Sequence, residues 1–316
     1  MKDFSNILVT GGAGFIGSHL VHRLVEQGKN VTVLDNLSYG AIENIEASEN
    51  NPNLKLIKGD IRDRKIVRNA MREADAVVHL AALIDVAESV NNPLETHDIN
   101  VNGTLALLDE AVKLDVKRFT FVSTTAVYGE GNPLPLREDY PLKPISPYAA
   151  SKAAAERHCT AFQTNHGLKT TILRLFNVYG PRSRSSSYAS VITIFLKNAR
   201  KGEPLVIFGD GGQTRDFIHV DDVINATVLA LNSDNSVNKI LNLCTGKPTT
   251  INELAQIVRE ISDSNAQITH SKPRKGDVYH NYGDPTKAEK TIGFKAKISI
   301  SEGLKQLVHE AQQGDM

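Results

Sequence analysis

A chain of 316 residues, 41% hydrophobic and 23% charged, is long enough to form one large or two unequal domains with buried cores. Lysines plus arginines equal aspartates plus glutamates at 36 each, which excludes a general electrostatic attraction to nucleic acid or to an anionic membrane. No apolar run reaches the length of a membrane span, and the first residues do not form a signal peptide. We therefore expect a cytoplasmic protein.

The first predicted strand, residues 6–10, runs into a glycine-rich turn, Thr10–Gly17, that opens a helix. Three glycines fit the G-x-G-x-x-G spacing, which permits a tight turn, close approach of a pyrophosphate and close helix–sheet packing. The free N–H groups and the dipole of such a helix start favour an anion. A second strand, residues 30–34, ends on Asp35, an acid that would accept hydrogen bonds from an adenosine ribose and repel a 2′-phosphate. The combination predicts a dinucleotide site and favours NAD over NADP.

Further strands alternate with helices, which predicts an α/β fold with a Rossmann-type, doubly wound parallel sheet. After about residue 178 the elements become shorter and more mixed. We predict an NAD-binding domain over residues 1–178, to which some later segments return, and a smaller mixed α/β substrate domain over 179–316, interleaved with the first. The further strands are expected at residues 54–57, 76–80, 118–122 and 169–176, with long helices at 93–114 and 148–166.

Several polar residues within these elements have alternative interpretations. Asp60 would either contact the adenine amino group or cap a helix before Arg62. Asn100 lies within a predicted helix, where asparagine is unfavourable, and would either serve the site or brace neighbouring backbone. His79 lies inside an apolar strand and is expected to be a core residue. Asp221 is expected, together with the next residue, to cap a helix that begins near residue 223.

Tyr148 and Lys152 are four residues apart and lie on one face of a predicted helix. An ammonium group near the phenol would favour the phenolate and lower the pKa of the tyrosine, and a cofactor cation would act in the same direction. The lysine also suits hydrogen bonds to a nicotinamide ribose. Ser123 and Thr124 end the fifth strand at the edge of the sheet where ligands bind. Thr124, Tyr148 and Lys152 form the candidate catalytic group.

With these residues the chain resembles the extended short-chain dehydrogenase/reductase superfamily and, within it, the UDP-sugar 4-epimerases. The resemblance covers nearly the whole length. It implies that Tyr148 is the acid/base, that Lys152 tunes it and that Thr124 shares the substrate proton. The motifs that carry it are Thr10–Gly17, Asp35-Asn36, Asp60, Ala81-Ala82, Ser123–Gly129, Tyr148–Lys152, Arg174–Pro181, Gly209–Asp222 and Arg274–Asp277.

The resemblance also implies the residues of two binding sites. The NAD site would consist of Gly11, Gly14, Phe15, Ile16, Gly17, Asp35, Asn36, Asp60, Ile61, Leu80, Ala81, Ala82, Asn100, Tyr148 and Lys152. The UDP-sugar site would consist of Thr124, Thr125, Tyr148, Asn177, Val191, Ile207, Phe208, Arg215, Arg274, Asp277 and Asn281.

Two positions bear on the reaction and the sugar. Sugar-nucleotide dehydratases carry acids at the positions of Thr125 and Ala126, and UDP-glucuronate decarboxylases carry glutamate at the second, so their absence favours simple oxidation at C4. Relatives with a bulky tyrosine at the position of Asn281 exclude N-acetyl sugars, whereas asparagine would admit them unless Tyr282 fills the same space. Leu175 replaces a tyrosine that packs against the nicotinamide in some epimerases, which predicts looser NAD retention.

The sequence thus predicts NAD-dependent 4-epimerisation of a UDP-hexose through a 4-keto sugar, with no metal. The alternatives are another sugar-nucleotide epimerase, for example one acting on UDP-glucuronate with Arg184 as an added cation, and a non-catalytic NAD-binding scaffold. The resemblance suggests a homodimer through the helices that begin near Pro93 and Tyr148.

Overall fold

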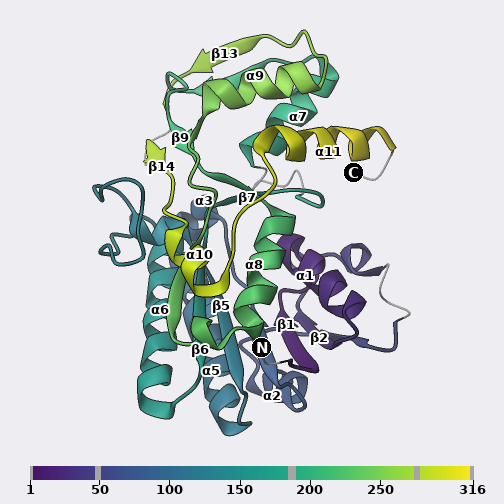
Figure 1. Cartoon of the computed structure of the whole chain (residues 1–316), viewed down its shortest axis with the longest axis vertical. Coiled ribbons are helices and arrows are strands. Elements are labelled where there is room, and N and C mark those ends of the chain that lie inside the picture. Colours follow the sequence, from purple (N-terminus) through teal and green to yellow (C-terminus); the bar gives the residue numbers. More distant parts are fainter. Residues whose placement is uncertain (1–2, 47–50, 184–189, 274–277, 314–316) are drawn as a thin grey trace.

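Within residues 3–46, 51–183, 190–273 and 278–313, which the computed structural model describes, seven parallel strands form a central sheet (Figure 1). The strand order is β11-β6-β5-β4-β1-β2-β3, so β1 pairs with β2 on one side and with β4 on the other. The direction of winding changes between β1 and β4, which is where open α/β sheets bind ligands. The strands are β1 (Asn6–Thr10), β2 (Asn30–Asp35), β3 (Leu54–Lys58), β4 (Ala76–His79), β5 (Arg118–Thr124), β6 (Thr170–Leu175) and β11 (Lys239–Leu243).

Helices cover both faces of the sheet, and each face has its own apolar core. On one face α1 (Phe15–Glu26), α8 (Val220–Asn232) and α10 (Thr286–Ile292) bury aliphatic side chains against the strands. On the other, α2 (Arg64–Met71), α5 (Gly103–Lys113) and α6 (Pro147–His166) do the same. This arrangement confirms the predicted doubly wound α/β fold.

The second half of the chain both completes the sheet and builds a separate cluster above it. β11 pairs with β6 and α8 packs against α1, so these later segments do return to the sheet. A third apolar core lies among the elements drawn at the top of Figure 1. The boundary at residue 178 stays a prediction. The elements of this core include α7 (Val191–Lys201), β8 (Leu205–Phe208), α9 (Ile251–Ile261), β13 (Ile268–Ser271) and α11 (Ile300–Gln313).

Short strands connect the two parts and lie beside the ends of the sheet strands. β7 pairs with β10, while β9 pairs with both β12 and β14. All five of these segments have only two or three residues, too few for a periodic pattern, and the sequence did not predict their pairing. They are β7 (Asn177–Tyr179), β9 (Thr214–Arg215), β10 (Phe217–His219), β12 (Thr249–Thr250) and β14 (His280–Asn281).

The two helical predictions have different outcomes. The predicted helix over 93–114 is continuous but irregular: α4 (Pro93–His97) runs into a π-helical turn, Asp98–Asn102, and then into α5. A short helix, α3 (Val86–Asn91), precedes it. Helix α8 begins at Val220, and the side chain that caps it is His219, which accepts from the Asp221 N–H. Asp222 instead accepts three hydrogen bonds from the backbone N–H groups of residues 297 and 298. It ties the C-terminal segment to α8.

Candidate functional site

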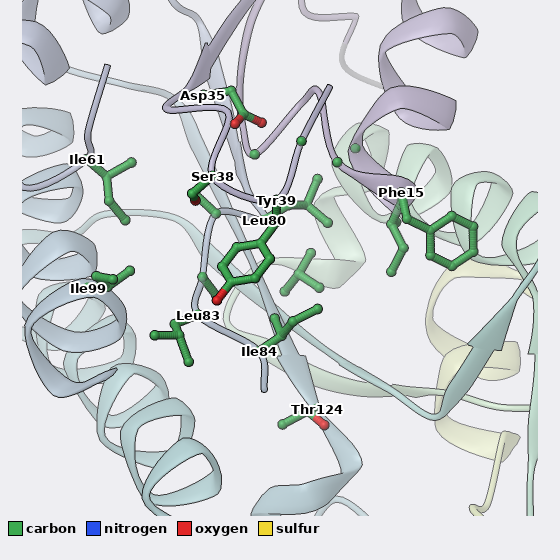
Figure 2. A pocket seen from close by; sticks show the side chains of 18 of the residues that line it. Phe15, Asp35, Ser38, Tyr39, Ile61, Leu80, Leu83, Ile84, Ile99 and Thr124 are labelled. Carbon is green, nitrogen blue, oxygen red and sulfur yellow. The ribbon is translucent and has the colours of Figure 1, made fainter. Parts of the chain in front are cut away.

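A cavity of about 620 Å³ lies at the carboxyl ends of the sheet strands, where β1 and β4 diverge. Figure 2 shows Asp35 and Ser38 at one end and Thr124 at the other, with Tyr39 lying across the space between them. Every residue predicted to bind NAD lines this cavity except Asn100. The structure therefore brings together, in one elongated groove, residues that are more than one hundred positions apart in the sequence.

The glycine turn shapes the floor of the groove by the absence of side chains. Gly11 has a φ of +70°, and a Cβ there would come within 2.7 Å of the Ala81 backbone nitrogen. A Cβ on Gly17 would collide with the carbonyl oxygen of Gly11. Helix α1 starts next to this turn with no side-chain cap and no acidic residue in its first turn. Backbone N–H groups are thus left to face an anion, which fits the pyrophosphate of NAD.

Two carboxylates mark the end of the groove expected to hold adenosine. Asp35 is 7% exposed, and its two oxygens accept from the N–H groups of Ala13 (2.9 Å) and Leu37 (2.8 Å). Burial raises the pKa of Asp35, while these two hydrogen bonds act in the opposite direction. Asp60 accepts from the Arg62 backbone and guanidinium, which lowers the pKa of Asp60. The cap of the following helix is Asp63, so the alternative of Asp60 as a helix cap is wrong.

The other end of the groove holds the candidate catalytic group. Ser146 caps α6 by accepting from the Ala149 N–H at 3.1 Å, and Pro147 occupies the first turn, so Tyr148 stands at the start of α6 beside the end of β5. A hydrogen bond with Thr124 lowers the pKa of Tyr148, but burial has the larger effect and raises it to about 12. The expected lowering of this pKa by Lys152 is absent from the structure. Its ammonium instead lies 4.2 Å from the centre of the Phe121 ring.

Lys152 is almost fully buried, and burial lowers the pKa of its ammonium to about 8, while Glu156, four residues further along α6, acts to raise it. Glu156 is itself 2% exposed and accepts from the Ser123 hydroxyl (2.6 Å) and from two nitrogens of Arg174 (3.0 and 2.7 Å). Ser123 and Arg174 are register partners on β5 and β6. One carboxylate therefore connects the catalytic helix to both strands beneath the site.

Asn100 braces backbone beside the groove rather than lining it. Its side chain accepts from the Leu83 N–H (2.8 Å) and donates to the Leu83 carbonyl (2.9 Å) and to the Ser151 hydroxyl (2.9 Å). Leu83 lines the groove and Ser151 precedes Lys152, so Asn100 acts through its neighbours. His79 is the expected core residue, hydrogen-bonded to Thr10 and Thr104.

The residues predicted to bind the sugar nucleotide fall into three groups. Thr125 donates to the Asn281 side chain at 2.9 Å, and Asn281 pairs with Arg215 across β14 and β9. Asn177 has a buried side-chain oxygen without a hydrogen-bond partner in the described residues, so it retains capacity for a ligand. Thr124 and Tyr148 line the groove, and the other described residues of this set are Val191, Ile207 and Phe208.

Of these, Ile207 has a side chain that is fully buried in the third core, so only its backbone groups could contact a ligand, and its role stays a prediction. Phe208 next to it is 36% exposed. The strand alternates, so only every second side chain faces outward. Val191 opens α7 and is partly exposed. Arg274, Asp277 and Arg184 lie outside the described residues.

The sequence also missed residues that line the groove. Tyr39 donates to Glu88 of α3 and so reaches across the groove. Arg182 reaches it from the segment after β7 and donates to the Ser18 hydroxyl at 3.2 Å. Tyr39 could have been predicted as a groove residue, because it follows Asp35 by only four positions. Arg182 could not, because no periodic pattern in the sequence marks it.

Among the described residues, every helix is too short or too polar to span a membrane.

Comparison with known proteins identifies relatives of nearly full length. Residues 7–244 match the NAD dependent epimerase/dehydratase family. A putative UDP-glucose 4-epimerase of Methanocaldococcus jannaschii is 42% identical over 305 residues, covering 96% of this chain and 97% of the relative. A UDP-N-acetyl-alpha-D-glucosaminuronate decarboxylase of Bacillus cytotoxicus is 35% identical over 314 residues, covering 95% and 96%.

Solved structures agree closely with this fold. The UDP-glucose 4-epimerase of Thermotoga maritima, solved with UDP-glucose, is 40% identical with a TM-score of 0.93, covering 98% of this chain and 99% of that one. The UDP-N-acetylglucosamine 4-epimerase of Methanobrevibacter ruminantium is 39% identical with a TM-score of 0.94, covering 99% and 100%. The UDP-glucose 4-epimerase of Thermus thermophilus, solved with NAD, is 36% identical with a TM-score of 0.89, covering 97% and 99%.

Proposed function

The chain belongs to the NAD dependent epimerase/dehydratase family, an NAD-using family of sugar-nucleotide enzymes, and we propose that it is a UDP-hexose 4-epimerase. The observation that carries the proposal is the placement of Thr124, Tyr148 and Lys152 at one end of the NAD groove. A non-catalytic scaffold would not require all three side chains there.

In the proposed mechanism, bound NAD supplies a reversible hydride acceptor for C4 of the sugar. Tyr148, as phenolate, takes the proton of the C4 hydroxyl, and Thr124 shares that proton through its hydrogen bond with the phenol. Lys152 would orient the nicotinamide ribose. After the 4-keto sugar has turned about its diphosphate, Tyr148 returns the proton to the oxygen on the other face. The protein thus supplies position and proton transfer.

The residues beside Thr124 support epimerisation over the other reactions of the family. Thr125 and Ala126 carry no carboxylate, and the Thr125 hydroxyl is engaged with Asn281. Elimination or decarboxylation would require an acid at these positions, as the family resemblance implies. A relative named as a putative epimerase and a relative named as a decarboxylase both match this chain over nearly its whole length, so the individual side chains are what favours one chemistry.

We propose that the enzyme accepts both UDP-glucose and UDP-N-acetylglucosamine. With its oxygen accepting from Thr125, Asn281 keeps its amide N–H groups for the carbonyl oxygen of an acetamido group. Replacing Asn281 with tyrosine should fill this space and lower kcat/KM for the N-acetyl substrate by roughly tenfold to a hundredfold relative to UDP-glucose, the scale of a steric misfit in a pocket.

The test is turnover of the purified protein, without added NAD, with each UDP-sugar in turn and chromatographic separation of the C4 epimers. Conversion supports the chemistry and a retained cofactor, and the rate ratio for native protein and N281Y tests the sugar assignment. No conversion of either sugar, with or without added NAD, would exclude UDP-hexose 4-epimerisation.

A further inference from the structure

Arg182 is a half-buried cation on the wall of the NAD groove that the reaction scheme above does not use. It lines the cavity together with Ser183, which follows it, and with the glycine turn that starts α1. Its Nη1 donates to the hydroxyl of Ser18, which lies in the first turn of α1 and is itself fully buried. A residue from the second half of the chain therefore stands at the N-terminus of the first helix.

The backbone holds the arginine there at a cost. Its φ is +63°, a left-handed conformation that non-glycine residues seldom adopt. The preceding residue is fixed as well, because His19 of α1 donates to the Pro181 carbonyl at 3.0 Å. Two contacts with α1 thus clamp a strained segment in a defined position, and such strain persists where the surroundings over-determine it.

The charges around Arg182 and the start of α1 favour the binding of an anion. Burial lowers the pKa of Arg182, which means that its charge has lost hydration without full compensation. Glu310 on α11 attracts the guanidinium and acts to raise this pKa, but burial has the larger effect. Beside it, α1 presents an uncapped positive end without any acid in its first turn. A partly desolvated cation and a helix N-terminus converge on the same space.

We propose that Arg182 binds a diphosphate at the N-terminus of α1, and that this diphosphate is the pyrophosphate of NAD. The groove offers two sources of a diphosphate, the cofactor and the sugar nucleotide. The cofactor is favoured because Ser18, the partner of Arg182, belongs to the helix that the glycine turn opens. Arg182 would then add a charge-assisted contact to those made by the backbone N–H groups. This proposal rests on NAD being the cofactor of the proposed enzyme and is independent of which sugar nucleotide is the substrate.

The test is calorimetric titration of the full chain, freed of nucleotide, with NAD, ADP, adenosine and UDP. R182Q should weaken NAD and ADP by roughly tenfold to a hundredfold, the effect of losing a hydrogen bond to a charged group. Adenosine, which lacks phosphate, and UDP should bind R182Q and native protein alike. S18A removes only the anchor of the guanidinium and should weaken ADP by a smaller factor.

A matched control is R23Q, which removes a positive charge from the last turn of the same helix and should leave all four affinities unchanged. Equal losses for ADP and adenosine would mean that Arg182 only shapes the groove. A loss for UDP alone would assign the residue to the sugar nucleotide, and no loss at all would remove it from the site. If R182Q does not fold, R182K and the salt dependence of ADP binding to native protein answer the same question.

Discussion

Burial acts in opposite directions on the two ionisable groups of the candidate catalytic pair. It raises the pKa of Tyr148 to about 12 and lowers the pKa of Lys152 to about 8. Both shifts favour the neutral side chain, because desolvation disfavours either charge. In the proposed mechanism the phenolate would therefore have to be stabilised by Thr124 and by the positive nicotinamide ring of bound NAD. The spacing of Tyr148 and Lys152 in the sequence does not reveal the free-energy cost of burying their charged forms.

The Tyr148 hydroxyl can be tested by removing one atom. Y148F should lower kcat by at least about a hundredfold, the usual contribution of a general acid/base, with sugar-nucleotide and NAD binding largely retained. Turnover is measured by chromatography and NAD content by absorbance after denaturation. Undiminished turnover would reject the tyrosine as the acid/base.

The buried Lys152 predicts a pH dependence of stability. Between its folded pKa of about 8 and its higher unfolded pKa, the unfolded chain binds more protons, so this residue makes stability rise with pH in that window. Below pH 8 its contribution is constant and unfavourable. Urea unfolding of native protein and K152M at pH 7, 8, 9 and 10 isolates the effect. Above pH 8 the free energy of unfolding of the native protein should increase relative to that of K152M. A difference between the two proteins that does not change with pH would contradict the assignment.

At the scale of the element, α6 is the part that assembles the site. Its capping residues place Tyr148 at the end of β5, and Glu156 fixes the body of the helix to β5 and β6. The Glu156–Arg174 pair is 2% exposed on both sides, so neither charge can be rehydrated if its partner is lost. The strand positions next to these partners, Thr124 and Leu175, both line the groove.

Breaking that pair should be costly in two ways. E156Q should lower the free energy of unfolding by about 3–5 kcal/mol, the penalty for leaving a buried charge uncompensated. It should also reduce kcat, because Thr124 and Tyr148 lose their common support. D139N, which breaks the exposed Arg137–Asp139 pair, is the control and should change stability by about 0.5 kcal/mol or less. Equal effects of the two variants in urea unfolding would contradict the structural role.

At the scale of the molecule, α3 and α4 present an apolar surface to solvent. Leu94 is 86% exposed, Val90 61% and Val86 49%. Both helices contact α6, which the family resemblance places at a dimer interface. We propose that a second copy of this chain covers these residues, since exposed large aliphatic side chains gathered on neighbouring helices mark interfaces.

A charge on this surface should separate the copies. L94D should convert a dimer into a monomer in analytical ultracentrifugation, because an unpaired carboxylate would be buried at the interface. I194D changes an exposed aliphatic residue of α7, which Figure 1 shows apart from α3; it is the control and should not alter the mass. A native protein that sediments as a monomer would refute the proposal.

The sequence by itself determined the parts of this protein that local pattern dictates. The doubly wound sheet was predictable because its buried strands are continuous apolar segments in the sequence. The NAD groove was predictable because the backbone of the first turn requires glycines. Tyr148 and Lys152 were predictable because four residues is the spacing of one helix face. The resemblance to 4-epimerases added the prediction of the reaction itself.

Only the tertiary structure decided how distant segments meet. The contacts of Glu156 with Ser123 and Arg174, of Thr125 with Asn281 and of Arg182 with Ser18 join residues that share no local period. The direction of the pKa shift of Tyr148 likewise depends on burial, which no spacing encodes. Side-chain periodicity determines which face of an element is apolar, whereas packing of whole elements determines which polar atoms come within hydrogen-bond distance and which charges lose water.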